Sequence, residues 1–288
     1  METHFEILNR EAEQIVKDIG IPPCPMILTK LMQEMRSDDP DFAKLGKLIG
    51  GDVSLAASML KTVNSPFYGL SRKATSVPQA IALLGLRHVA ELVSGLLLRQ
   101  AFPGGTSELM DEFWEASTGI AQISALLVRH FKHVDRDGLQ TFGLFRDCGM
   151  LAMMQKFENY EPVFAGARPR EDASVTASED LHYAINHAWV GYQMAKTWLL
   201  PEEVCLAVLR HHDYTELQTN GTGIPISSLQ HIALTLAAES IFVKQERGET
   251  SAEWALGSAF ALHQMGMTQA DLDEIAGTIT SELAAQQR

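Results

Sequence analysis

Apolar residues recur at intervals of three and four along almost the whole chain, and this period constrains the fold more than any other feature. In residues 52–64, for example, Leu55, Met59 and Val63 fall on one face of a helix. No window of alternating apolar and polar residues is convincing as a strand. The sequence therefore predicts an all-α protein.

The helical period also predicts where the helices lie. The expected ranges are 5–19, 26–35, 41–49, 52–64, 76–85 and 86–98, followed by 113–131, 138–157, 181–199, 201–212, 228–244 and 268–285. Asp41, Asp52 and Ser76 open three of these helices with side chains suited to N-capping. Residues 158–178 lose the period in a mixture of Pro, Gly, Ala and charge, which predicts an extended surface segment.

The charge distribution favours two modules. Residues 1–110 hold 12 acids and 11 bases, which gives a net charge of −1. Residues 111–288 hold the remaining 24 acids and 12 bases, which gives −12 of the total net charge of −13. Helix-breaking and polar turn residues at 102–107 mark the expected boundary. This boundary predicts an N-terminal helical subdomain, 1–102, and a second helical subdomain, 108–288. The acidic balance argues against nucleic acid as the main partner, because such binding requires Lys and Arg to neutralise phosphates.

Cysteine use and hydropathy indicate a cytoplasmic location. The three cysteines, Cys24, Cys148 and Cys205, are odd in number and widely spaced, which fits reduced thiols better than a disulfide framework. The N-terminus lacks a basic region followed by an apolar one, and no run approaches 18 apolar residues. We therefore expect neither a signal peptide nor a membrane partner.

One group of side chains could carry chemistry. Imidazole and carboxylate groups are the ligands that Zn, Mn and Fe sites use, and several lie on successive helical segments that could converge in a bundle. They are Asp147, His187, His211, His212, Asp213 and Glu239. Spacing alone leaves another interpretation open: His187 could hydrogen-bond within the bundle, His211 and His212 could mark a helix C-terminus, and Glu239 could be solvated.

Three blocks of sequence resemble the signature of the HDOD family, the HD-related output domain of bacterial signalling proteins. They are Ile21-Pro22-Pro23-Cys24-Pro25, the run from Asp52 to Ser65, and the run from Ser76 to Gly85. The resemblance continues through Gly143-Leu144-Phe145-Arg146-Asp147-Cys148-Gly149, His187, and the His211-His212 pair, and spans roughly residues 20–240. It implies one HDOD unit followed by C-terminal helices, with an HD-like helical bundle behind an N-terminal helical subdomain.

The metal-dependent phosphohydrolases related to this family hold divalent ions through a first histidine, a His-Asp pair and a later aspartate. In this chain no histidine lies between His88 and His130, where the first one is expected beside residues 114–117, and Arg146 replaces the histidine of the pair. Glu239 stands at the expected place of the late aspartate. Asp147, His187, His211, His212 and Glu239 thus form the candidate remnant of a metal site.

Arg146 argues against hydrolysis because a guanidinium offers no lone pair to a metal and stays positively charged. We expect no catalytic residue, no cofactor and no bound metal, with Arg146 either replacing the metal as the cation that holds Asp147 or Glu239, or turning its side chain to solvent. The resemblance then implies a non-catalytic signal-transduction output domain of the response-regulator type, with signalling proteins as partners. Two alternatives remain open: a phosphohydrolase or cyclic-nucleotide phosphodiesterase with a rearranged Mn, Fe or Zn site, and a pocket in which Arg146 binds a nucleotide or phosphate without cleaving it.

Overall fold

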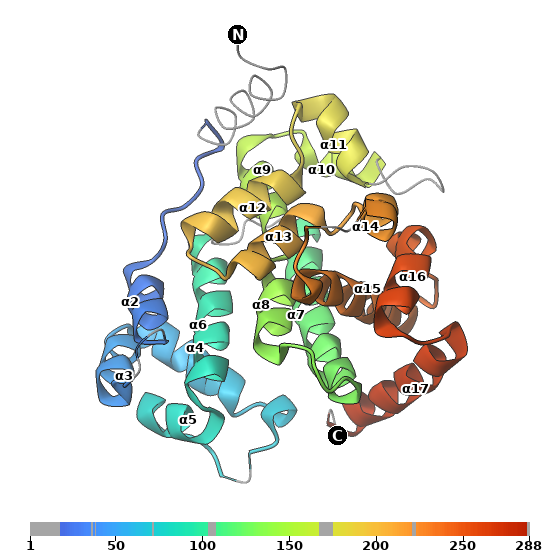
Figure 1. The fold of residues 1–288 in the computed structure, drawn as a ribbon. Coiled ribbons are helices and arrows are strands. Elements are labelled where there is room, and N and C mark those ends of the chain that lie inside the picture. The colour runs from blue at the N-terminus through green and yellow to red at the C-terminus, as the bar shows by residue number, and fades with distance from the viewer. Residues whose placement is uncertain are drawn as a thin grey trace. The chain divides into compact units, whose positions relative to one another are not determined.

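The computed structural model describes residues 18–35, 37, 39–70, 72–102, 108–166, 175–220 and 223–286, and every regular element among them is helical (Figure 1). The prediction of an all-α protein is confirmed. The helix expected at 5–19 and most of the boundary expected at 102–107 lie outside the described residues.

The chain divides into two compact units, residues 23–103 with 277–288, and residues 1–22 with 104–276. Helices of the first unit are α2 (Met26–Met35), α3 (Phe42–Gly50), α4 (Val53–Val63), η1 (Pro66–Tyr68), α5 (Val77–Leu84) and α6 (Leu86–Ala101). Those of the second are α7 (Glu108–Leu127), η2 (Val128–His130), α8 (Arg136–Phe145), α9 (Cys148–Lys156), α10 (Tyr160–Gly166), α11 (Val175–Tyr183), α12 (His187–Thr197), α13 (Glu202–Arg210), α14 (Tyr214–Asn220), α15 (Ile226–Arg247) and α16 (Ala252–Met265). Helix α17 (Gln269–Gln286) begins in the second unit and ends in the first.

In the unit of residues 23–103, short polar side chains start the helices as the sequence predicts. The Asp41 carboxylate accepts the amide of Lys44, and that of Asp52 accepts the amide of Leu55. The Ser76 hydroxyl caps α5 in the same way. Each contact satisfies a first-turn N–H group that has no partner within its helix, which fixes where the helix begins.

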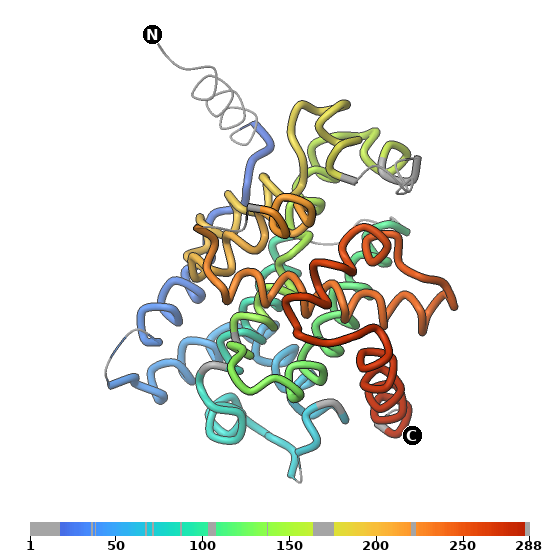
Figure 2. The backbone as a smooth tube through the Cα atoms, turned by 45° about the vertical axis from the view of Figure 1, so that its right-hand side comes forward, coloured from blue at the N-terminus to red at the C-terminus, as the bar shows by residue number. Residues whose placement is uncertain are grey.

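The unit of residues 104–276 is built around α15, which packs against α7 and α16 (Figure 2). Eleven of its residues are buried, from Ser228 to Ile241. Among the described helices, α15 has the length and hydropathy of a membrane span, but 61% of that window is buried inside the protein, as expected of a core helix.

Three of the expected ranges are wrong in detail. The segment 158–178 was expected to be extended, but it contains α10 and the start of α11, which lie side by side (Figures 1 and 2). The range 138–157 is two helices, α8 and α9, separated at Arg146 and Asp147. The range 181–199 is likewise divided, because Ala184 adopts a left-handed φ of 55° and Asn186 caps α12 with its side chain. Helices α14 and α16 lie outside the ranges predicted from the sequence.

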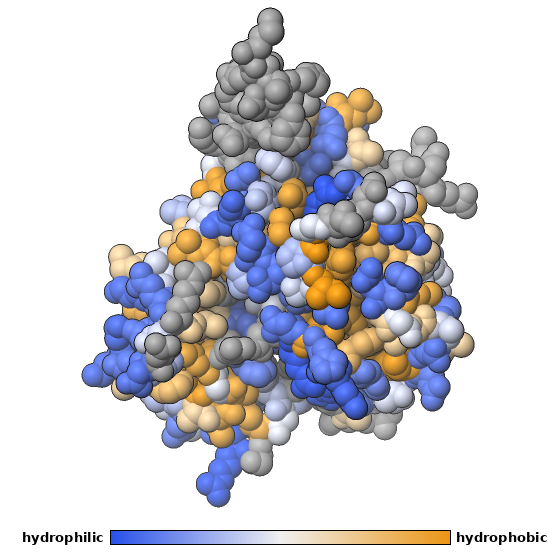
Figure 3. Space-filling view, viewed as in Figure 1, coloured by the Kyte–Doolittle hydropathy of each residue, from blue (hydrophilic) through white to orange (hydrophobic). Residues whose placement is uncertain are grey.

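Large apolar side chains reach the surface in the unit of residues 23–103. Met26, Phe42, Val53 and Leu83 are all more than half exposed. On the face shown in Figure 3, hydrophobic and hydrophilic residues are interspersed. Hydropathy on this face therefore marks no single contact surface among the described residues.

Candidate functional site

Glycine allows two helices to meet at the site. A Cβ atom on Gly149, in α9, would lie 2.0 Å from the backbone oxygen of His187 and 2.6 Å from the amide nitrogen of Gly191, both in α12. No side chain fits in that space, so α9 and α12 touch through their backbones. This contact brings Asp147, just before α9, close to His187, at the start of α12.

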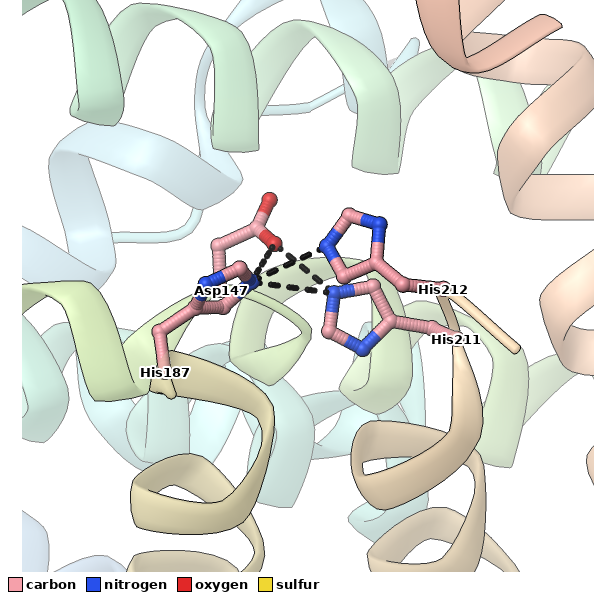
Figure 4. Close-up of side chains that lie close together, drawn as sticks. All are labelled: Asp147, His187, His211 and His212. Carbon is pink, nitrogen blue, oxygen red and sulfur yellow. Dashed lines mark hydrogen bonds and ion pairs between the residues drawn. The ribbon is translucent and has the colours of Figure 1, made fainter. Parts of the chain in front are cut away.

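Asp147 and three histidines converge in one cluster (Figure 4). His187 Nε2 lies 3.0 Å from His212 Nε2 and 3.4 Å from His211 Nε2. Asp147 Oδ1 lies 3.1 Å from His211 Nε2 and 3.5 Å from His187 Nε2. One atom from each of the four side chains lies within 4.8 Å of all the others. We call these four residues the His–Asp cluster.

Each histidine of the cluster is held by its other ring nitrogen. His187 Nδ1 lies 2.7 Å from the Glu179 carboxylate, and His212 Nδ1 lies 2.9 Å from the Glu253 carboxylate. His211 Nδ1 lies 2.7 Å from the carbonyl oxygen of Val208. A carbonyl or ionised carboxylate only accepts hydrogen bonds, so all three Nδ1 atoms carry the hydrogen and donate it. The three Nε2 atoms face the centre of the cluster.

Both carboxylates that hold the histidines are ionised. Burial would raise the pKa of Glu179, but the His187 ring and its hydrogen bonds lower it. Burial also opposes ionisation of Glu253, but His212 lowers its pKa to about 2. Glu179 is further fixed by a hydrogen bond from the Tyr160 hydroxyl and another, 2.9 Å long, from the backbone amide of His187.

The two most buried histidines carry different charges in the absence of an ion. Burial favours the neutral form of His187, but Glu179 and Asp147 outweigh it and raise its pKa to about 10. Burial lowers the pKa of His211 to about 3, and the neighbouring His212 contributes in the same direction. His187 is therefore an imidazolium at neutral pH, whereas His211 is neutral.

Arg146 binds the opposite oxygen of the Asp147 carboxylate. Its Nε and Nη2 donate to Asp147 Oδ2 at 3.0 and 2.8 Å, and its Nη1 donates to Glu239 Oε2 at 2.7 Å. The side chain is only 13% exposed, so it has not turned to solvent. Burial opposes ionisation of Asp147, but the Arg146 charge and the histidines hold its pKa well below 3.8. For Glu239, burial prevails over Arg146 and raises the pKa.

The structure separates the residues that the sequence grouped together. Asp147, His187, His211 and His212 form the cluster, whereas Glu239 binds Arg146 and accepts a hydrogen bond from the Ser251 hydroxyl at 2.8 Å. Asp213 contacts Arg210 at 3.2 Å and is not part of the cluster.

Sequence reasoning missed Glu179 and Glu253, the carboxylates that orient two of the rings. Glu179 lies in the segment predicted to be extended, and Glu253 lies in a helix for which there was no expectation. Glu179 lies 8 residues from His187 in the sequence, and Glu253 lies 41 residues from His212, and neither separation is typical of a carboxylate that binds a histidine. Only the packing of α11 and α16 reveals them.

A cleft of about 350 Å³ reaches the site from α7. Its lining includes Asp147, Glu115, Met150 and Ser117. Ser117 lies in the stretch 114–117, where the resemblance described above implies a histidine. Ser117 has no imidazole to offer, so on this side Asp147 faces the cleft without a histidine from α7.

One family model and several solved structures are similar to this chain. The family model described as "HDOD domain" matches residues 21–214. A solved HDOD domain protein of unknown function from Geobacter sulfurreducens has 18% sequence identity and a TM-score of 0.70, with 96% of each chain covered. A solved protein from Marinobacter aquaeolei VT8, described as a candidate signal transduction protein, has 17% identity and a TM-score of 0.68, covering 99% of this chain and 67% of that one.

An uncharacterized protein of Treponema pallidum (strain Nichols) is 20% identical over 269 residues. The match covers 93% of this chain but only 50% of the relative, so this chain spans about half the length of the curated protein that it matches.

Proposed function

Because the chain belongs to the HDOD family, we propose that it is a bacterial signal-transduction output domain that acts through protein contacts and does not hydrolyse phosphate esters. The domain model covers more than half of the chain, in agreement with the resemblance in its sequence blocks. The similarity to the Marinobacter candidate signal transduction protein supports the fold, and its description favours a signalling role. A cytoplasmic location and signalling proteins as partners are part of this proposal.

The observation that carries the non-catalytic part is the double ion pair of Arg146. Metal-assisted hydrolysis requires an ion with an open position where it can activate water or polarise a phosphoryl oxygen. On one side of Asp147, a guanidinium that contacts both Asp147 Oδ2 and Glu239 occupies the space between the two carboxylates. These two oxygens are thus committed to Arg146 and do not hold an ion between the two carboxylates.

The nucleotide-binding alternative has less support from the same geometry. Three N–H groups of Arg146 already donate to carboxylates, and its side chain is 13% exposed. An incoming phosphate would meet Asp147 and Glu239 as well as Arg146, and two carboxylates repel an anion. We therefore favour a protein partner over a phosphate ligand.

An assay with phosphomonoesters, phosphodiesters and cyclic dinucleotides tests the absence of hydrolysis. Purified wild-type chain is incubated with each substrate in the presence of Mn²⁺, Fe²⁺ or Zn²⁺, with His187→Ala as the matched control. We expect the two proteins to give the same background rate. Turnover by the wild type that His187→Ala abolishes would establish the rearranged hydrolase instead.

Crosslinking in cells, followed by reconstitution from purified chains, tests the signalling role. We expect a direct, saturable complex with a component of a signalling pathway. A thermal-shift screen with nucleotides provides the contrast. Stabilisation by a nucleotide that Arg146→Met removes, together with the lack of a signalling partner, would favour the nucleotide-binding pocket.

A further inference from the structure

Four separations within the His–Asp cluster are close to those of a tetrahedral metal site. Zinc binds imidazole nitrogen and carboxylate oxygen at about 2.0–2.2 Å, which places neighbouring tetrahedral ligand atoms about 3.3–3.6 Å apart. Four of the six separations among Asp147 Oδ1 and the three Nε2 atoms are 3.0, 3.1, 3.4 and 3.5 Å, and the four ligand atoms all lie within 4.8 Å of one another. The cluster is thus the size of one ion's coordination sphere.

The ring orientations supply the lone pairs that such an ion requires. Glu179, Glu253 and the Val208 carbonyl each accept the Nδ1 hydrogen of one histidine, so each ring directs its Nε2 atom to the centre. His187, which is an imidazolium without an ion, would release its Nε2 proton as the metal binds. Metal-binding histidines are commonly held in this way, with the second ring nitrogen donating to a carboxylate or carbonyl. Three independent contacts, from α11, α13 and α16, orient the rings toward one point.

The charge around the cluster also suits a cation. Asp147 contributes one negative charge directly, and Glu179 and Glu253 contribute two more behind the histidines, against the positive charge of Arg146. The positive charge of the His187 imidazolium is lost when the metal replaces its Nε2 proton. His187, Glu179 and His211 are at most 2% exposed, so these charges act where water screens them little.

We propose that the chain binds one divalent transition-metal ion of the zinc type through Asp147 Oδ1 and the Nε2 atoms of His187, His211 and His212. Three imidazoles and one carboxylate are a donor set for Zn²⁺ and similar ions, not for Mg²⁺ or Ca²⁺, which bind mainly oxygen. Arg146 does not occupy this position, because it contacts Oδ2 while the histidines face Oδ1. It holds the other half of the carboxylate and limits the site to one ion.

A metal on the Oδ1 side of Asp147 would differ from the expectation that Arg146 excludes a metal, and its binding is separate from the proposed signalling function. An ion that joins residues beside α9, α12 and α13 stabilises the domain whether or not the domain has a catalytic activity. Loss of the metal site would leave the signalling proposal untouched, whereas metal-dependent turnover would overturn that proposal and leave the site standing.

Metal titration of the chelator-treated full chain tests the proposal. The chain is dialysed against Zn²⁺, its bound metal is measured by mass spectrometry, and its melting temperature is recorded. Co²⁺ serves as a spectroscopic probe, because its visible absorption reports coordination by nitrogen and oxygen. We expect one Zn²⁺ per chain, a rise in melting temperature with Zn²⁺ but not with Mg²⁺, and intense Co²⁺ bands typical of four-coordinate geometry.

Variants localise the bound ion. His212→Ala removes a ligand, and Glu253→Gln weakens the group that orients it, so we expect His212→Ala to bind at least tenfold more weakly and Glu253→Gln about 10- to 100-fold more weakly. His231→Gln is the matched control, since His231 is also fully buried but lies outside the cluster. Circular dichroism checks that each variant is folded, and Asp147→Asn replaces any variant that is not.

Two results would overturn the proposal. One is a wild-type chain that takes up less than a tenth of an equivalent of Zn²⁺ or Co²⁺ at micromolar free metal. The other is stoichiometric uptake that the cluster variants and His231→Gln share equally, since the ion would then sit on exposed histidines elsewhere.

Discussion

Replacement of Arg146 by methionine tests the interpretation that this guanidinium neutralises two buried carboxylates. The substitution keeps a long unbranched side chain but removes three hydrogen bonds of 2.7–3.0 Å to Asp147 and Glu239. Both carboxylates remain behind, only 19% and 13% exposed. Removal of one partner of a buried ion pair typically costs about 3–5 kcal/mol, because it leaves an uncompensated charge. Residual exposure favours the lower end, so we expect a loss of about 3 kcal/mol at pH 7.5.

The loss should depend on pH in a defined direction. In the wild type the pKa of Asp147 lies well below 3.8, so its contribution to the free energy of unfolding is present above pH 3.8 and is lost as the pH falls through the folded-state pKa. Without Arg146 this pKa rises, and the carboxyl can take up a proton in the folded variant. The difference between wild type and variant should therefore be largest at neutral pH and smaller at pH 5.

Urea unfolding followed by tryptophan fluorescence measures the effect, because all four tryptophans lie in the unit of residues 104–276. Lys244→Met is the matched control: its ion pair with Asp273 is exposed and 3.8 Å long, and its loss should change the free energy of unfolding by no more than about 1 kcal/mol. Addition of Glu239→Gln to Arg146→Met should restore part of the stability. A loss below 1 kcal/mol for Arg146→Met, or an equal loss at pH 7.5 and pH 5, would refute the reasoning.

Three other predictions concern packing, protonation and thiol reactivity. Gly149→Ala should lower the free energy of unfolding by about 3 kcal/mol or more in the same urea assay, because its Cβ would collide with the backbone of His187. Gly277→Ala is the control, because Gly277 lies in open space on a helix and its replacement should not destabilise the chain. Similar losses for the two variants would contradict the close contact between α9 and α12. Burial lowers the pKa of His231 below 6.5, so the unfolded chain binds a proton at this histidine before the folded chain does, and the free energy of unfolding falls as the pH drops below 6.5. His231→Gln should reduce the slope of the free energy of unfolding against pH in this range. An unchanged slope would contradict the lowered pKa of His231. In the folded chain a thiol reagent at pH 7.5 should modify the partly exposed Cys24 well before Cys148 and Cys205, because these two are buried and burial raises their pKa values. Mass spectrometry measures the three rates, and equal rates would disprove this prediction.

The sequence determined those parts of the secondary structure that depend on residues close together in the chain. N-capping by Asp41, Asp52 and Ser76 depends on a side chain and an amide three residues later, so these helix starts could be predicted. The spacing of apolar residues predicts the all-α class, and the three sequence blocks indicate the HDOD family. The breaks at Arg146 and Ala184 were missed, because the apolar period continues across both.

The tertiary structure alone decided how the candidate site is arranged. From the sequence, Asp147, His187, His211 and His212 could be named as candidates. So could Asp213, which pairs with Arg210, and Glu239, which is joined to Asp147 only through Arg146. The chain does not encode locally which oxygen of Asp147 faces Arg146 and which faces the histidines. That choice, and the orientation of the rings by Glu179 and Glu253, arise when helices distant in sequence pack together and buried polar groups must find partners.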